Sequence, residues 1–148
     1  MEEVSRVFSP LLAGARAART LAERHLTAPL DLLGRWMIAE IFFRSGLVKL
    51  ASFETTVDLF RDEYQTPFFS PEIAAVLATA TELTMPVLLL LGLFARLAAI
   101  PLLAMTAMIQ FTYFYHSEHY FWAFVLLLLI VRGPGAWSVD HWLRRRFG

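Results

Sequence analysis

Long apolar runs alternate with shorter polar stretches along most of the chain, and four of these runs approach the length of a membrane span. They lie at about residues 32–50, 73–93, 97–115 and 117–132. A helix needs about 20 apolar residues to cross a bilayer, and a backbone that faces lipid has to satisfy its own hydrogen bonds. The pattern therefore predicts an all-α, polytopic membrane protein built as a bundle of four transmembrane helices.

The segments that flank these runs predict two further helices. Residues 1–29 carry apolar side chains at near-helical spacing with arginines between them. Such a segment is either an amphipathic interfacial helix held on the inner leaflet by anionic lipid, or a helix docked on a partner. The remaining domain, residues 30–148, ends in a short cytoplasmic helix that Trp137 and Trp142 anchor and that Ser138 or Asp140 caps. No apolar core of signal-peptide length precedes it, so we expect the N-terminus to be retained.

Positive charge gathers at one side of the predicted membrane. Eight arginines flank the outermost runs: Arg6, Arg16, Arg19, Arg24, Arg132, Arg144, Arg145 and Arg146. Arg96 lies in the short connection between the second and third runs, whereas the loop after the first run sets Arg61 against five acidic residues. Because Lys and Arg favour the cytoplasmic side, we expect both termini to be cytoplasmic and the bundle to lie in the inner membrane.

Composition narrows the class of function. Of the 148 residues, 57% are hydrophobic, and the mean hydropathy is +0.55, above the range of ordinary soluble domains. Thirteen basic residues balance thirteen acidic ones, so no basic surplus points to nucleic acid. The absence of cysteine excludes disulfides and thiolate metal sites within the chain. No phosphate-binding loop, HExxH or GxSxG pattern is present, so we do not expect a self-contained hydrolase.

Several ionisable residues fall inside the predicted spans. At about 1.5 Å of rise per residue, Glu40 lies about 12 Å and Arg44 about 18 Å from the inner end of the first span. Glu82 lies about 17 Å from the same face of a core about 30 Å thick. Glu40 and Arg44 also share a helix face through their i, i+4 spacing. We therefore expect an interior polar cluster of Glu40, Arg44 and Glu82, with Arg35 at its inner edge.

The cost of burying charge in lipid limits the explanations for this cluster. A charged side chain at the bilayer centre costs at least about 2.5–3.5 kcal/mol. Ionisable groups at this depth therefore mark a binding site, or else form a salt-bridge network that fixes helix register. Lys49 is expected near the outer surface, where it can snorkel to water. Gln110 either closes the cluster from the outer side or makes a single interhelical hydrogen bond.

The stretch "YHSEHY" places His116 and His119 at the outer mouth of the bundle. Two histidines three residues apart on a helix can share a metal ion, but a protein site usually needs three or four ligands. The alternative is that these histidines cap a turn, which is the preferred interpretation, so no metal site is assigned.

Three stretches resemble the DoxX family of small four-helix integral membrane proteins: "GRWMIAEIFFRSGLVKL", "ATATELTMPVLLLLGLFARLAAI" and "GPGAWSVDHWLRRR". The resemblance covers roughly residues 32–146. It implies a link to membrane redox chemistry, because the family takes its name from a subunit associated with thiosulfate:quinone oxidoreduction and other members are linked to redox complexes. By position, the resemblance gives these polar motif residues: Gly46, Lys49, Glu82, Arg96, Gly133, Gly135, Ser138 and Asp140.

Two hypotheses of function follow. In the first, the chain is a subunit of a membrane oxidoreductase rather than a self-contained enzyme. It binds a quinone or a similar apolar redox ligand near Glu40, Arg44 and Glu82, where a carboxylate exchanges protons and a cation stabilises a reduced anionic oxygen. Redox partner proteins and a homo-oligomer are compatible with it, whereas a self-contained dithiol mechanism is excluded. In the second, it is a non-catalytic binding, transport or anchoring module for a small hydrophobic or anionic molecule. The candidate ligand-binding residues are Arg35, Glu40, Arg44, Lys49, Glu82 and Gln110.

Overall fold

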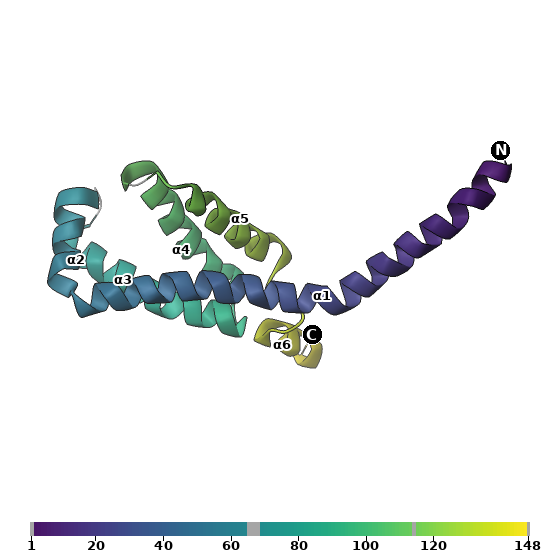
Figure 1. The fold of residues 1–148 in the computed structure, drawn as a ribbon. Coiled ribbons are helices and arrows are strands. Elements are labelled where there is room, and N and C mark those ends of the chain that lie inside the picture. Colours follow the sequence, from purple (N-terminus) through teal and green to yellow (C-terminus); the bar gives the residue numbers. More distant parts are fainter. Residues whose placement is uncertain (1, 65–68, 114, 148) are drawn as a thin grey trace.

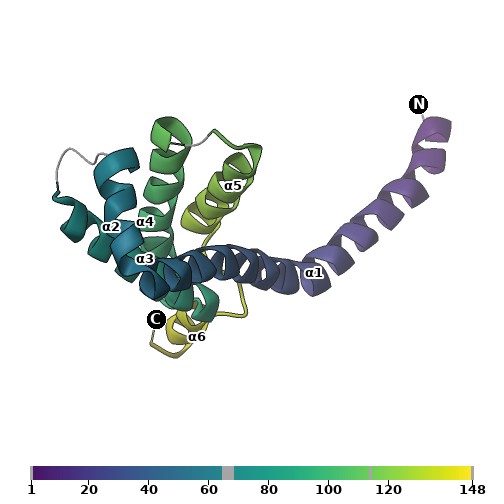
Figure 2. The same ribbon diagram turned by 60° about the vertical axis from the view of Figure 1, so that its left-hand side comes forward.

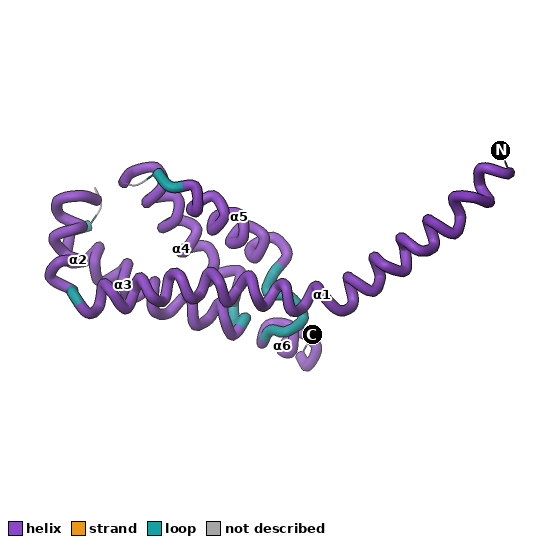
Figure 3. Tube along the Cα trace, viewed as in Figure 1, coloured by secondary structure: helices purple, strands orange, loops and turns teal. Residues whose placement is uncertain are grey.

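The computed structural model describes residues 2–64, 69–113 and 115–147, and the regular structure in these ranges is helical throughout (Figure 3). The all-α class is thereby confirmed. In chain order the elements are α1 (Glu2–Ala51), α2 (Phe53–Leu59), the π-helix η1 (Phe60–Tyr64), α3 (Pro71–Leu91), α4 (Ala95–Met108), the π-helix η2 (Ile109–Tyr113), α5 (Ser117–Arg132) and α6 (Val139–Phe147).

The C-terminal half of α1 runs alongside α3, and α4 packs against both α3 and α5 (Figures 1 and 2). The N-terminal part of α1 projects away from the bundle, and residues 12–26 are exposed. The helix expected over residues 1–29 is therefore continuous with the first predicted span. Pro29, which has no amide hydrogen to donate, lies inside this long helix.

The other predicted spans coincide with helices. Residues 73–93 correspond to α3, residues 97–115 to α4 with η2, and residues 117–132 to α5; residue 114 lies outside the described residues. Among the described residues, α3 is the one helix that is both long and apolar enough to cross a membrane, and a shorter apolar helical stretch covers Ala95–Phe111. Local sequence sets the ends of α3: Ser70 caps its start by accepting from the Ile73 amide, and Gly92 ends it at φ 67°.

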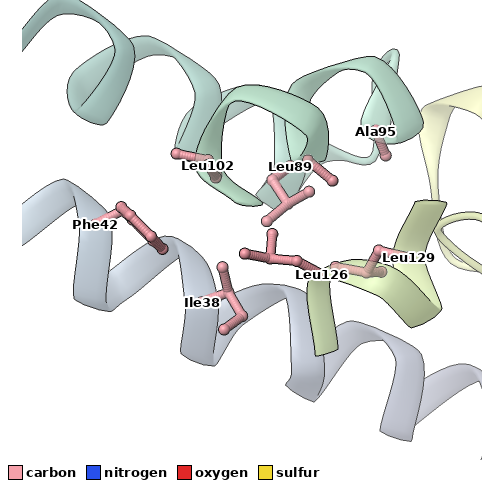
Figure 4. Packing of buried hydrophobic residues seen from close by; sticks show 8 residues of the cluster. Ile38, Phe42, Leu89, Ala95, Leu102, Leu126 and Leu129 are labelled. Carbon is pink, nitrogen blue, oxygen red and sulfur yellow. The ribbon is translucent and has the colours of Figure 1, made fainter. Parts of the chain in front are cut away.

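The hydrophobic core joins α1, α3, α4 and α5 near the α3–α4 turn (Figure 4). Its buried members are Ile38, Phe42, Leu89, Ala95, Ala99, Leu102, Leu126 and Leu129. Alanines on α4 allow that helix to approach its neighbours closely. Farther from the turn, Phe60 of η1 covers Ala74 and Ala75 of α3 in a second, smaller cluster.

The C-terminal segment is fastened to the α3–α4 turn by Asp140. Its carboxylate accepts from the amides of Phe94 (2.8 Å) and Ala95 (3.0 Å), which are free donors at the start of α4. Its own amide donates to the Gly92 carbonyl oxygen at 2.9 Å. Ser138, by contrast, caps α6 itself by accepting from the His141 amide at 3.2 Å. Of the two cap residues considered from the sequence, Ser138 therefore serves α6, and Asp140 serves α4.

Arg35 completes this attachment from the side of α1. Its buried guanidinium donates to the carbonyl oxygens of Leu90 (2.9 Å) and Leu89 (3.4 Å), and also to the carbonyl oxygen of Trp137. Leu89 and Leu90 lie at the end of α3, and Trp137 lies in the segment before α6. One side chain of α1 therefore connects α1 to both of these segments. Arg35 was expected at the inner edge of a polar cluster with Glu40, Arg44 and Glu82, whereas its guanidinium is bonded to backbone carbonyl oxygens at the α3–α4 turn.

Candidate functional site

The middle of the bundle contains a buried ion pair between α1 and α3. Lys49 Nζ lies 3.0 Å and 2.9 Å from the two carboxylate oxygens of Glu82, and 2.8 Å from Ser45 Oγ. The Lys49 side chain is 15% exposed and that of Glu82 only 2%. Both charges are thus compensated within the bundle, and each depends on the other, since a buried charge left without its partner is costly.

A glycine brings the two helices close enough for this pair to form. A Cβ atom built on Gly46 would lie 3.0 Å from Glu82 Cβ and 2.9 Å from Leu83 Cδ2. Any larger residue at position 46 would push α1 away from α3. Gly46 therefore determines the distance that the Lys49 side chain has to bridge.

An open cavity of about 310 Å³ adjoins the pair and is almost entirely apolar. We call it the apolar cavity. Its walls come from η1, α3 and α4, and include Phe60, Tyr64, Leu77, Pro101, Met105 and Met108. Lys49 and Glu82 are the only charged side chains among its described lining residues. Its size lies at the lower end of the range for small-molecule sites, which combine apolar walls with a few placed polar groups.

Lys49 also borders a second cavity, of about 370 Å³, on the side of α2. Four hydroxyl-bearing residues line this hydroxyl cavity: Ser45, Ser52, Thr55 and Thr56. Thr56 Oγ1 donates to the carbonyl oxygens of Lys49 and Ser52, both at 3.1 Å, which fixes the start of α2 against the end of α1. The ion pair thus stands between an apolar space and a space whose walls can hydrogen-bond.

The interior cluster expected from Glu40, Arg44 and Glu82 does not form. Arg44 Nη1 bonds to Glu40 Oε1 at 3.0 Å on the exposed side of α1, where the two side chains are 77% and 42% exposed. Glu82 is paired instead with Lys49, and the expectation that Lys49 snorkels to the outer surface was wrong. The reason is the rotation along the helix: Lys49 follows Arg44 by a step of five residues, which turns their side chains about 140° apart.

Gln110 belongs to a separate contact at the start of α5. Its Oε1 accepts from the His116 amide at 3.1 Å and lies 2.6 Å from His119 Nδ1. The His119 ring packs against Trp122, with centroids 4.8 Å apart. Gln110 of η2 therefore makes an interhelical contact to the start of α5, and it does not belong to a polar cluster with Glu82. No group of three or more potential metal ligands occurs in the part of the chain that the structure describes.

Sequence reasoning missed the residues that shape the two cavities. Ser45 carries an i, i+4 signal, because it lies one helical turn before Lys49. The seven-residue spacing of Arg35, Phe42 and Lys49, with Gly46 beside them, marks the face of α1 that packs on α3. The walls that come from η1 and α4 have no comparable local signal, since they meet the pair only in the folded chain.

An all-helical fold with an apolar helix of spanning length, and a charged pair buried against that helix, is typical of helical membrane proteins. The family model of DoxX matches residues 30–115, more than half of the chain. The chain therefore belongs to the DoxX family, a family of membrane proteins. Comparison with curated proteins and with solved structures gives no significant match.

Proposed function

We propose that the protein is a multi-pass protein of the inner membrane, crossed by α1 from about residue 32, by α3, by α4 with η2, and by α5, with both termini cytoplasmic. Large apolar side chains on the outside of the bundle support this placement, among them Val76, Ile100, Phe124 and Leu127. Arginines at the α3–α4 turn and on α6 favour the cytoplasmic side for that end.

Within this placement, we infer that the chain binds a quinone in the apolar cavity, as a subunit of a membrane oxidoreductase system. The observation that carries this inference is the single ion pair, Lys49–Glu82, at the wall of an otherwise apolar cavity. A quinone has the matching chemistry, with an apolar body and polar oxygens that gain negative charge and protons on reduction. The described lining of the cavity therefore fits this ligand.

The residues of the pair have distinct roles in this proposal. When a quinone binds, the Lys49 ammonium exchanges one of its hydrogen bonds to Glu82 for a bond to a quinone oxygen, and it stabilises the negative charge that develops there. Glu82 holds Lys49 in place and exchanges a proton with the same oxygen. The hydroxyl cavity gives that proton a polar route towards α2. Electrons come from a separate redox partner, because a chain without cysteine has no dithiol of its own.

Matched tryptophan substitutions on α3 test the proposal. Leu77 lines the apolar cavity and its neighbour Val76 does not, while the two residues are similarly exposed, at 48% and 52%. We expect the wild-type chain in nanodiscs to bind a short-chain benzoquinone, measured by equilibrium partitioning and absorbance. Leu77→Trp should weaken binding at least about tenfold (about 1.4 kcal/mol) because it fills the cavity, and Val76→Trp should bind like wild type.

The double variant Lys49→Met/Glu82→Leu adds a test of the polar end of the site, because replacing both members leaves no buried charge without its partner. It should reduce quinone affinity while leaving the other apolar walls in place. If the wild-type chain binds no quinone, or if Leu77→Trp and Val76→Trp bind it equally well, the proposal that a quinone occupies the apolar cavity is wrong. The alternative, a non-catalytic module for another small hydrophobic or anionic molecule, would then take its place.

A further inference from the structure

The exposed ion pair of Glu40 and Arg44, in the second half of α1, has no role in the site described above. Glu40 and Arg44 lie on the side of α1 that faces away from the bundle, one turn apart and joined at 3.0 Å. In the membrane placement proposed above, on which this inference rests, Arg44 is level with the buried Glu82. Lipid offers these two side chains no hydrogen-bonding partners, and charged groups at membrane depth normally face protein or a polar cavity.

The same side of α1 carries a regular apolar pattern. Exposed residues recur with alternating steps of three and four: Leu33, Trp36, Glu40, Phe43, Leu47 and Leu50. We call this set the α1 seam. Its seven-residue repeat is the spacing that brings two helices together along their length, and Glu40 is its single polar member.

The opposite side of α1 is already occupied. Arg35, Ile38, Phe42 and Gly46 are buried against the remainder of the chain, where α1 contacts α3 and α5. The residues of the α1 seam are exposed in the described part of the chain, which leaves this side of the helix without a partner there. The seam is thus a second packing surface on a helix whose first surface is filled.

We propose that a second copy of this chain covers the α1 seam, with the two α1 helices parallel about a two-fold axis along the membrane normal. Two copies inserted in the same orientation bring equal levels of α1 face to face. Arg44 reaches back one turn to Glu40, so both charges lie at one level and their sum is zero. A patch of this kind is complementary to itself, as a two-fold interface requires.

Hydrogen bonding also favours a second copy. The Arg44 guanidinium has five donors, and the described contacts use only Nη1. Across the axis, the remaining donors can reach the carboxylate of the second copy, which gives a closed ring of two cations and two anions. One polar residue at one position of an otherwise apolar seam also fixes which register the helices adopt.

The absence of cysteine allows a direct test. The single variants Phe43→Cys and Leu47→Cys are made in an otherwise wild-type chain and kept in the membrane. Both should form disulfide-linked dimers on mild oxidation, because positions of the α1 seam meet across the two-fold axis. Ile100→Cys, at an equally lipid-facing site on α4, is the matched control. We expect cross-linking at the seam to exceed that at the control at least fivefold, and equal yields would overturn the proposal.

Charge reversal tests the ion pair itself. Glu40→Arg alone and Arg44→Glu alone each place four like charges at the axis, so each chain, carrying Phe43→Cys as a reporter, should lose its cross-linked dimer. Co-expression of the two differently tagged chains should restore a mixed dimer, and failure to restore it would count against the pairing. If a charge-reversal variant does not insert into the membrane, the comparison of cross-linking at the seam with that at Ile100→Cys still tests the dimer.

One further measurement separates this proposal from the membrane placement. A charged, membrane-impermeant maleimide should not label Phe43→Cys in sealed vesicles. Labelling would place α1 outside the bilayer and overturn both proposals. Protection from labelling without cross-linking would overturn the dimer alone, and quinone binding to the apolar cavity would be unaffected by that result.

Discussion

Two ion pairs that involve the second half of α1 differ in their dependence on the fold. Lys49 and Glu82 are buried between helices, whereas Glu40 and Arg44 are joined along one exposed side of the same helix. Removing one member of a buried pair strands the other charge, while replacing both members with apolar residues is often tolerated. The two pairs are therefore expected to respond differently to substitution.

Glu82→Gln should destabilise the bundle by about 3–5 kcal/mol because it leaves the Lys49 ammonium buried without its counter-ion. Thermal unfolding in detergent, followed by circular dichroism, measures the effect. The double variant Lys49→Met/Glu82→Leu should recover most of the lost stability. If the double variant is as unstable as the sum of the single ones, the two residues do not act as a pair.

At this scale the rise per residue did not identify the partner of Glu82. Depth along the helix matched Glu82 with Arg44 and placed Lys49 near the outer surface, whereas Glu82 pairs with Lys49 and lies against Gly46, both of which are motif residues. The choice between Arg44 and Lys49 as the partner depends on how α1 is rotated against α3. That rotation is set by the close approach at Gly46, a property of two helices together.

Among the elements, α6 has an effect larger than its length suggests, because its Asp140 caps another helix. The two α4 amides that it binds have no partner within α4 itself. The sequence suggested Asp140 as a cap residue but assigned it to α6, since local spacing relates a cap only to the helix that follows it. A cap supplied from 45 positions along the chain has no such local signal.

Gly92 makes the attachment of this element possible. Its φ of 67° favours glycine, and a Cβ there would lie 2.4 Å from Ser138 Cβ and 2.5 Å from Arg35 Nη1. Gly92→Ala should therefore destabilise the bundle by at least about 1–2 kcal/mol from backbone strain, with the displaced contacts in addition. Limited proteolysis at the arginines of α6 should become faster in this variant.

Gly14→Ala is the matched control for that experiment. Gly14 lies in the projecting part of α1, with nothing within 4 Å of an added Cβ. The substitution should leave bundle unfolding unchanged, while local helix stability rises by about 1 kcal/mol. Equal destabilisation by both substitutions would show that the crowding at Gly92 has no role.

For the whole molecule, the question is how far the projecting part of α1 contributes to the bundle. Residues 12–26 are exposed, and the core begins at Ile38. Removing residues 1–27 should therefore change the unfolding midpoint of the bundle by less than about 2 °C. A fall well beyond this would mean that the segment packs on the bundle in solution.

The overall plan of helices was accessible from the sequence because apolar runs and their breaks are local features. The positions of α3, α4 with η2, and α5 follow the predicted runs closely. The cavities were not accessible, because their walls combine η1, α3 and α4, and depend on how π-helical turns reorient side chains such as Phe60. A sequence pattern indicates each helix separately, whereas a cavity forms only where side chains of several helices meet.

The bonds of Asp140 and Arg35 at the α3–α4 turn also set an order of events during synthesis. The amides of Phe94 and Ala95 are synthesised long before the Asp140 carboxylate that caps them. The interval between the synthesis of Arg35 and that of its partner, the carbonyl oxygen of Trp137, is longer still. The start of α4 and the end of α3 therefore acquire their last partners only after the chain has been synthesised as far as Trp137 and Asp140. A chain that stalls before Asp140 leaves this end of the bundle open, and so exposes truncated products to quality control.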